Sequence, residues 1–353
     1  MYEITLSGTP YERGLQQGRA YASLLRELYE KCPTWLGNLK PAQVNLIRET
    51  MVRALKTIFP EMVDELQGIS DGSGISFSDV CLVNFVSAIG SFGGCTNLVS
   101  LNSEVGPVLA KTSDIGDDYI YYCVHRVEPK QGFGYFSVSW VGCLWAELGM
   151  NTAGLAVGQS SGPTQLGQIG EGVPTLEYPR LILERCQNVT EAITWCKQTP
   201  MAGKGLNIAL VDASGIGAII EKSGTATAIR FPLASGQEMR LGIAPNSVYC
   251  TNIFLEEDMR DCQELAVPGF PGLTDNSAQR LKVVDHFLRQ NPKPSFQAIE
   301  NLLKTPLSSQ GLCQQSFKPS ITHFAYILLP REQKMVIYEG VAENRLKQKE
   351  YSL

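Results

Sequence analysis

The order of helical and β-like blocks is the feature that most constrains the fold of this chain. Apolar residues recur at helical spacing through 44–58, 60–69 and 77–89, and Pro60 and the glycine-containing run 71–74 separate these stretches. Each stretch is long enough for an amphipathic helix. The first quarter of the chain is therefore expected to be mostly helical.

A capping box marks the start of the first helix. In the run Thr9-Pro10-Tyr11-Glu12, the threonine is the expected N-cap, the proline takes the first helical position and the glutamate reaches back. A short strand over 2–7 precedes this run, and the helix is expected to continue to about Lys31. Gly14 and Gly18 lie four residues apart on one face of it, an arrangement that we interpret as close packing against another element.

Past residue 95 the pattern changes to short β-like runs, which two pairs of helices interrupt. The expected strands are 96–101, 108–111, 120–127, 134–140, 145–150, 154–158, 206–212, 217–221, 225–231, 247–251, 321–329 and 334–339. The expected helices are 178–186, 190–198, 277–289 and 295–304, with Thr190 and Ser277 as N-caps, and the polar tail 345–353 is expected to be frayed. This order is not the strict strand–helix alternation of a doubly wound sheet. It favours an α+β fold in which two antiparallel sheets are stacked between helical layers.

Composition excludes several classes of protein. The chain has 353 residues, of which 44% are hydrophobic and 18% charged, as is ordinary for a soluble globular protein. A net charge of −5 argues against a nucleic-acid binder, which normally carries a basic face. No apolar run reaches membrane-spanning length, and the first residues do not form a signal peptide, so we expect no membrane partner and a cytoplasmic location.

The cysteines and histidines do not form a metal-binding pattern. Ten cysteines are scattered without CxxC spacing, which in this context favours reduced thiols over a disulfide framework or a zinc site. The three histidines are His125, His286 and His323, and nothing in their local sequence marks a partner for a cysteine nucleophile. A conventional Cys/His peptidase remains a minor alternative.

The run Gly93-Gly94-Cys95 at the start of an expected strand is the strongest candidate for chemistry. The two glycines let the chain bend sharply, so that a nucleophile can approach the carbonyl carbon of Gly94. A thiol at Cys95 could attack that carbonyl, and water could then release a chain that begins with Cys95. The new α-amine, with a reference pKa of about 7.7–8.0, could act as general base for its own thiol. Taken alone, the run also fits a buried cysteine in a glycine-rich turn.

Polar residues at the ends of apolar strands are further candidates. Asp114 follows Cys95 by nineteen residues, the right distance for a hairpin that brings the acid back beside the cysteine, and Lys111 would favour the thiolate by its charge. Asn252 ends the strand 247–251, where its amide could donate to a developing oxyanion. Arg280, expected in the first turn of a helix, opposes the helix dipole there, so it needs another partner such as a carboxylate. The polar run that includes Ser161 is a candidate rim of a substrate pocket.

In this order the candidate residues resemble the N-terminal-nucleophile (Ntn) hydrolases. The chain is most similar to the group around isopenicillin N acyltransferase, with the choloylglycine hydrolases and penicillin V acylases as more distant relatives. The motifs that carry the resemblance are Gly8-Thr9-Pro10-Tyr11-Glu12-Arg13-Gly14 with Gly18, Gly94-Cys95-Thr96, the Asn207-strand-Asp212 unit, Thr251-Asn252 and Ser277-x-x-Arg280. They extend over nearly the whole chain.

The resemblance implies a four-layer αββα fold and self-cleavage between Gly94 and Cys95. A helical segment 1–94 would stay attached to a catalytic region 95–353, the two forming one structural domain. The resemblance also implies that Cys95 is nucleophile and base, that Asp114 orients its amine, that Asn252 helps hold the oxyanion and that Arg280 supports the site. Lys111, Ser161 and Asn207 are the expected substrate-binding residues.

Two departures from the family pattern bear on the substrate. Relatives usually show Arg-Asn-x-Asp or Asn-Trp-Asp before the acid, where this chain has Lys111-Thr112-Ser113-Asp114, and the pocket residue expected after the central hairpin falls near Ser161. The expected reaction cleaves or transfers an acyl group at a carboxamide or thioester of a small molecule. No cofactor is expected, although acyl-coenzyme A or an acyl carrier protein could donate the acyl group to an amine. A catalytically silent binding protein with the same fold is the main alternative, and a homo-oligomer remains open.

Overall fold

The computed structural model describes residues 1–36, 40–89, 93–116, 120–164, 172–234, 236–265, 271–316, 320–343 and 345–353. Ser91 and Phe92, which precede the two glycines, lie outside these residues.

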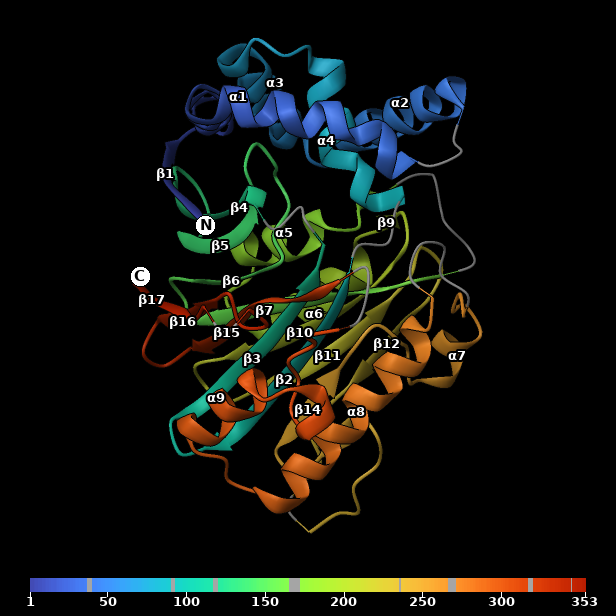
Figure 1. Ribbon diagram of the computed structural model, residues 1–353. Coiled ribbons are helices and arrows are strands. Elements are labelled where there is room, and N and C mark those ends of the chain that lie inside the picture. Colours follow the sequence, from blue (N-terminus) through green and yellow to red (C-terminus); the bar gives the residue numbers. More distant parts are fainter. Residues whose placement is uncertain are drawn as a thin grey trace.

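The first part of the described chain is one strand followed by helices, as expected. Its elements are β1 (Tyr2–Gly8), α1 (Pro10–Leu36), α2 (Pro41–Ile58), α3 (Pro60–Ser73) and α4 (Phe77–Ile89). The capping box is confirmed, since Thr9 N donates to the Glu12 carboxylate at 2.7 Å and Glu12 N donates to Thr9 Oγ1 at 3.3 Å. Figure 1 shows α1–α4 gathered together at one end of the molecule.

Close packing of α1 on α3 explains the spaced glycines. A Cβ on Gly14 would lie 2.0 Å from the Glu65 carbonyl oxygen, and one on Gly18 would lie 2.4 Å from that of Ile69. Gly68 of α3 approaches the Tyr11 carbonyl oxygen of α1 in the same way, at 2.2 Å from an added Cβ. Glycines on both helices therefore let the two backbones touch.

Two large sheets form the centre of the described structure. The first, sheet A, has the order β1-β4-β5-β6-β7-β10-β11-β12, with β4 (Tyr122–Pro129), β5 (Tyr135–Trp140), β6 (Leu148–Asn151), β7 (Leu155–Gly162), β10 (Gly205–Asp212), β11 (Gly217–Lys222) and β12 (Thr227–Arg230). The second, sheet B, has the order β13-β14-β2-β3-β15-β16-β17, with β13 (Ile243–Ala244), β14 (Ser247–Cys250), β2 (Gly94–Ser103), β3 (Gly106–Ile115), β15 (Ile321–Leu329), β16 (Lys334–Glu339) and β17 (Lys347–Ser352). Neighbouring strands are antiparallel except that β1 pairs with β4 in parallel.

Helices cover the outer faces of both sheets. The remaining elements are α5 (Glu177–Arg185), α6 (Val189–Gln198), α7 (Glu257–Arg260), α8 (Leu273–Gln290), α9 (Phe296–Lys304), the 3₁₀ turn η2 (Leu307–Ser309) and the short parallel pair β8 (Val173–Pro174) and β9 (Met201–Ala202). One apolar cluster joins the N-terminal helices, α5 and α6 to sheet A, a second lies between the two sheets, and a third joins sheet B to α8 and α9. Figure 1 shows α8 and α9 on the side of the sheets away from α1–α4. The expected four-layer αββα architecture is confirmed.

Three local expectations are wrong. The N-cap of α6 is Asn188, whose side chain accepts from Glu191 N, and not Thr190. Helix α8 begins at Leu273, a turn before Ser277, because the buried Leu273 extends the apolar face of the helix. The tail is not frayed, since Lys347–Ser352 pairs with β16 as an edge strand. Its charged residues resemble a solvated tail in the sequence. On an edge strand, such residues discourage pairing of the exposed edge with another chain.

Candidate active site

The turn before β2 requires glycine. Gly93 has φ +66°, and a Cβ there would lie 2.0 Å from the Asp114 carbonyl oxygen, a distance that no side chain can adopt. Strand β2 then pairs with β3, so that Gly94 stands opposite Asp114 and Cys95 opposite Ser113. The hairpin expected from the spacing is therefore confirmed, and it brings β3 directly beside the cysteine.

Successive side chains along β2 and β3 point to opposite faces of sheet B, so the site residues are divided between these two faces. Lys111 and Ser113 both contact Glu147, which precedes β6 of sheet A, so their side chains face the space between the sheets. Because Cys95 stands opposite Ser113, its thiol faces the same space. Asp114 is the next residue after Ser113, so its side chain points to the opposite face of sheet B, which α8 covers.

A buried charge pair lies beside the thiol. Lys111 Nζ is 3.1 Å from Glu147 Oε1, and Ser113 Oγ donates to the same carboxylate oxygen. Burial raises the pKa of the Cys95 thiol to about 11, the Lys111 charge lowers it, and Glu147 raises it. Burial alone would lower the pKa of Lys111, but the Cys95 and Glu147 charges outweigh burial and raise it. In the uncut chain the thiol is therefore neutral near pH 7, with a cation poised to stabilise its thiolate.

Glu147 is a site residue that sequence reasoning missed. The expected strand 145–150 contains it, and the available signal was a single acid in the apolar run Leu144-Trp145-Ala146-Glu147-Leu148. Its side chain is 2% exposed. A carboxylate is rarely buried without a partner, so such a residue is a candidate for a functional site.

Arg280 and Asn252 hold the backbone of Cys95. Cys95 N donates to Asn252 Oδ1 at 2.8 Å, and Arg280 Nη1 donates to the Cys95 carbonyl oxygen at 2.5 Å. Arg280 also donates to Thr96 Oγ1 at 2.9 Å and to Asn252 Oδ1 at 2.9 Å. Two donors at Oδ1 fix the orientation of the asparagine amide. The structure thus brings three expected site residues together, with Asn252 at the Gly94–Cys95 peptide and Arg280 at the Cys95–Thr96 peptide.

The setting of Arg280 differs from expectation. It lies two turns into α8, because the helix begins at Leu273, so it does not oppose the helix dipole at the first turn. Among the described residues its guanidinium forms no ion pair within 4.0 Å, and neutral oxygens accept its hydrogen bonds. Burial lowers the pKa of Arg280, while the more distant Asp114 opposes that shift.

Asp114 lies on the α8 side of sheet B. Thr322 Oγ1 donates to Asp114 Oδ1 at 2.5 Å, and Gln314 Nε2 donates to Asp114 Oδ2. A Cβ on Gly94 would lie 3.2 Å from Asp114 Oδ2, so the carboxyl group borders the Gly94–Cys95 peptide. Burial raises the pKa of Asp114, against the lowering effect of Arg280. That Asp114 orients the amine stays a prediction, because in this chain Cys95 N donates to Asn252.

Ser161 and Asn207 support Asn252. Asn252 Nδ2 donates to the Ser161 carbonyl oxygen at 3.0 Å and to Ser161 Oγ at 3.1 Å. Asn207 is fully buried in β10 and donates to the Thr251 carbonyl oxygen at 3.0 Å. The contacts of both residues fix the segment that carries Asn252. Their contact with substrate stays a prediction.

None of the three histidines is among the groups that act most strongly on the Cys95 thiol. The charged groups that act most strongly on the Cys95 thiol are Lys111, Glu147 and Asp114. His125 lies buried on β4, where burial first and the Arg180 charge second lower its pKa to about 4. His323 Nδ1 is 3.5 Å from Glu343. Nothing in the described residues therefore favours a Cys/His peptidase.

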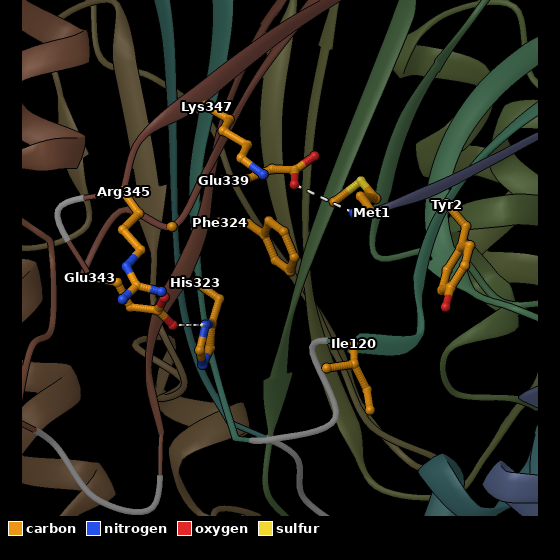
Figure 2. Close-up of a pocket in the computed structure, with 10 residues that line it drawn as sticks. Met1, Tyr2, Ile120, His323, Phe324, Glu339, Glu343, Arg345 and Lys347 are labelled. Atoms are coloured by element: carbon orange, nitrogen blue, oxygen red, sulfur yellow. Dashed lines mark hydrogen bonds and ion pairs between the residues drawn. The ribbon is translucent and has the colours of Figure 1, made fainter.

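A pocket opens between β1 and the strands β15–β17. Its volume is about 410 Å³, and Figure 2 shows Tyr2 and Ile120 on one side of it with His323 and Arg345 on the other. Phe324, which also lines it, stands opposite Ser113 in the register of sheet B. The pocket thus borders the row of side chains that contains Cys95.

Metal-binding and membrane-spanning features are not found in the part of the chain that the structure describes. No group of three or more His, Cys, Asp or Glu side chains there could hold a metal ion. No described helix is both long and apolar enough to cross a membrane.

Comparison with solved structures returns a hydrolase, an acylase and an amidase. The conjugated bile acid hydrolase of Clostridium perfringens is 10% identical with a TM-score of 0.46, over 73% of this chain and 92% of the other. Penicillin V acylase from Agrobacterium tumefaciens is 16% identical with a TM-score of 0.43, over 69% and 83%. The N-acylethanolamine-hydrolyzing acid amidase ortholog of Caenorhabditis elegans is 12% identical with a TM-score of 0.44, over 73% and 100%.

The sequence itself identifies the family. A search of curated protein sequences returns no match to this chain. The family model described as acyl-coenzyme A:6-aminopenicillanic acid acyl-transferase matches residues 101–344, more than two thirds of the chain. The match includes Lys111, Asp114, Asn252 and Arg280, and it begins six residues after Cys95. The chain therefore belongs to the acyl-coenzyme A:6-aminopenicillanic acid acyl-transferase family.

Proposed function

We propose that this protein is a self-processing acyl-transferring or amide-hydrolysing enzyme with Cys95 as its nucleophile. Membership of the acyl-transferase family supports acyl chemistry on a small molecule. The observation that supports the role of Cys95 is the way in which its backbone N–H and C=O are both held. Asn252 accepts from its nitrogen, Arg280 donates to its carbonyl oxygen, and its thiol faces the Lys111–Glu147 pair.

Self-processing would begin with attack of the Cys95 sulfur on the Gly94 carbonyl carbon. The C–N bond breaks as the C–S bond forms, the thiol proton passes to the new amine, and a thioester joins the two parts of the chain. Water then hydrolyses this thioester, giving a carboxylate at Gly94 and a free thiol and α-amine at Cys95. Glycine at 93 suits this step, because a Cβ there would lie 2.0 Å from the Asp114 carbonyl oxygen, and at 94 a Cβ would be 3.2 Å from Asp114 Oδ2.

The cut form would then act on an external acyl group. The α-amine, with a reference pKa of about 7.7–8.0, takes the thiol proton as the sulfur attacks a carboxamide or thioester carbon. Asn252 Oδ1 is placed to accept from this amine, and Lys111 stabilises the thiolate. The leaving group departs with a proton, which leaves a thioester on Cys95 that water or an amine resolves. Acyl-coenzyme A and an acyl carrier protein are candidate donors for the second route.

Intact mass under denaturing conditions, with N-terminal sequencing of any fragments, tests the proposal. We expect two chains, the larger beginning Cys95-Thr96-Asn97, and we expect Cys95→Ala to give one chain of about the full 38.7 kDa. The matched control is Cys250→Ala, a buried cysteine on the neighbouring strand β14, which should still be cut.

Acylation of Cys95 gives a second readout. Incubation with a thioester or amide donor should add the acyl mass to the Cys95 peptide of the parent and of Cys250→Ala. A single chain that is neither cut nor acylated under any condition would contradict the proposal and would favour a binding protein with this fold.

A further inference from the structure

The segment between β5 and β6 is held in place by side chains from the N-terminal helices. Gly142 N donates to Gln17 Oε1 of α1 at 3.0 Å, and Leu144 N donates to Asn84 Oδ1 of α4 at 2.7 Å. Asn84 Nδ2 donates back to the Gly142 carbonyl oxygen at 3.2 Å. Both amide side chains are almost fully buried.

We propose that Gln17 and Asn84 are positioning residues that act on Cys95 through Glu147. The inference rests on the proposed function of Cys95, and it assigns the N-terminal helices a part in the active site beyond covering sheet A.

The buried segment depends on these amides. Residues 141–146 lie outside the strands, so backbone N–H and C=O groups there need partners from elsewhere, and a buried group without one costs about 1–3 kcal/mol. Gly142 has φ +72°, and a Cβ there would lie 1.5 Å from Leu25 Cδ1 of α1, so the segment is pressed against that helix. The path of the segment is thus set by α1 and α4.

Glu147 comes directly after this segment. Its own nitrogen donates to the Val138 carbonyl oxygen at 2.8 Å, and Ala146 N donates to the Leu176 carbonyl oxygen at 3.3 Å. Its carboxylate accepts from Ser113 and lies 3.1 Å from Lys111 Nζ. A displacement of about 1 Å at such a site is enough to weaken catalysis strongly. Loss of the Gln17 or Asn84 contact would therefore displace the Glu147 carboxylate relative to Lys111.

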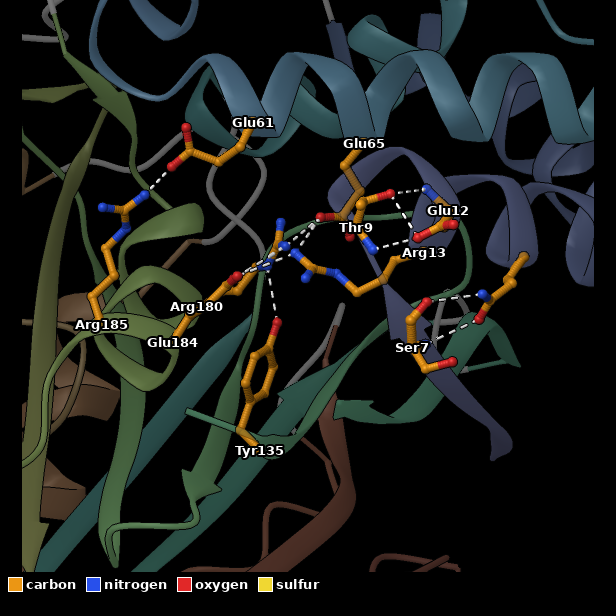
Figure 3. A network of polar contacts seen from close by, with 11 residues as sticks. Ser7, Thr9, Glu12, Arg13, Glu61, Glu65, Tyr135, Arg180, Glu184 and Arg185 are labelled. Atoms are coloured by element: carbon orange, nitrogen blue, oxygen red, sulfur yellow. Dashed lines mark hydrogen bonds and ion pairs between the residues drawn. The ribbon is translucent and has the colours of Figure 1, made fainter. Parts of the chain in front are cut away.

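The helices that carry these amides are themselves fixed on the rest of the molecule. Arg13 of α1 pairs with Glu65 of α3 at 2.9 Å and with Glu184 of α5 at 3.1 Å, and Arg180 of α5 pairs with Glu65 at 2.5 Å. Figure 3 shows these side chains converging between the helices, with Tyr135 of β5 beneath them. Helix α5 starts directly after Leu176, the acceptor for Ala146. The supports of the segment thus belong to one connected unit.

The experiment measures the apparent pKa of the Cys95 thiol. The full protein is alkylated at a series of pH values, and mass spectrometry measures the rate of alkylation on the peptide that contains Cys95. Cut protein is compared only with cut protein, and uncut only with uncut. The titratable and charged groups that act on this thiol are Lys111, Glu147, Tyr122 and Tyr326 between the sheets and Asp114 and Arg280 on the α8 side of sheet B. Of these, the proposal requires only the contribution of Glu147 to change.

Three variants and one control separate the outcomes. Because the Glu147 charge raises the pKa of the thiol, Glu147→Gln should lower it, by about half a unit or more. Gln17→Met keeps the length of the side chain but removes the acceptor, and Asn84→Asp keeps one acceptor but removes the donor. Each should shift the thiol pKa in the same direction as Glu147→Gln. Gln67→Met, on the exposed face of α3, should leave it unchanged.

The double variants decide whether the effect passes through Glu147. Gln17→Met or Asn84→Asp in the Glu147→Gln background should add less than about 0.3 unit, since residues that act through one group are not additive. Two results would overturn the inference but leave the proposed function standing. One is that the pKa shifts of the single variants add fully in the double variants, and the other is that neither amide variant shifts the pKa although Glu147→Gln does. No shift from Glu147→Gln itself would overturn both the inference and the proposed thiol environment. If one amide variant does not fold, the other carries the test.

Discussion

At the scale of single residues, the site is built from buried polar groups that cost free energy to bury. Arg280 is fully buried and, within the described part of the chain, its five hydrogen bonds go to neutral oxygens, while Lys111 and Glu147 lie buried beside the Cys95 thiol. Burial of a charged group is expensive unless it is paired and hydrogen-bonded. Such costs are typical of residues retained for function. Glu177 is an equally costly residue that lies outside this site.

Glu177 gives a prediction on pH dependence. It is fully buried at the start of α5, neither carboxylate oxygen has a hydrogen-bond partner among the residues that the structure describes, and burial raises its pKa to about 8. The unfolded chain releases this proton near its reference pKa of about 4.3, so between about pH 4.3 and 8 the folded state holds more protons. The free energy of unfolding should therefore fall as the pH rises through this window, by at most about 1.4 kcal/mol per unit.

Glu177→Gln removes this proton uptake. The variant should match the parent near pH 4 and be more stable than the parent at pH 8.5, as measured by urea denaturation at each pH. A difference in stability that stays constant from pH 4 to 8.5 would show that Glu177 does not hold an extra proton in the folded state.

At the scale of elements, the contact between α1 and α3 depends on glycine. An alanine at 68 would bring its Cβ to 2.2 Å from the Tyr11 carbonyl oxygen, and backbone atoms cannot move aside as a flexible side chain can. The exchange of Gly for Ala raises helix propensity by about 1 kcal/mol, but the forced separation of the helices costs about 1–3 kcal/mol. We expect the steric cost to exceed the gain in helix propensity, so that the alanine variant is less stable than the parent.

Gly68→Ala should therefore lower the urea midpoint of unfolding. Gln67→Ala, the neighbouring exposed position, should change the free energy of unfolding by less than about 0.5 kcal/mol. If Gly68→Ala were as stable as the parent, the close approach of the two backbones would not be a feature of the folded protein.

At the scale of the whole molecule, the N-terminal segment is integrated into the fold rather than attached to it. Strand β1 pairs in parallel with β4 in sheet A, and the helices share an apolar cluster with α5 and α6. The Arg13–Glu65–Arg180–Glu184 network lies across this junction. If the chain is cut at Gly94, these contacts would hold the two parts together without a peptide bond.

The network can be tested with a matched pair of glutamates on α3. Glu65→Gln leaves two buried arginines with one carboxylate fewer and should cost about 3 kcal/mol of folding free energy. Glu61→Gln affects an ion pair with Arg185 in which both side chains are at least 34% exposed, and it should cost less than about 1 kcal/mol. Denaturation and hydrogen exchange of α1–α4 would measure both. Equal effects of the two variants on stability would contradict a stabilising role of the buried Arg13–Glu65–Arg180–Glu184 network.

Much of the fold could be predicted because its signals are local. The sequence alone predicts the capping box at Thr9, the helices after it and the β-like runs, since periodicity, prolines and glycines act over a few residues. The N-cap of α6, the start of α8 and the strand β17 were missed. The start of α8 and the strand β17 depend on whether a partner surface is available: buried Leu273 needs the core, and the charged strand β17 needs β16 beside it. The N-cap of α6 is a local choice between Asn188 and Thr190, which the hydrogen bond from Glu191 N to Asn188 decides.

For the site, the sequence by itself determined that Cys95 follows two glycines and enters a strand, and that Asp114 returns beside it. These follow from spacing along one hairpin. Only the tertiary structure decided that Glu147 faces the thiol with Lys111, that Asn252 and Arg280 hold the backbone N–H and C=O of Cys95, and that Gln17 and Asn84 support the segment before Glu147. The physical reason is that these partners come from separate elements, and the stacking of two sheets and their helices, which no local pattern specifies, sets which of them meet.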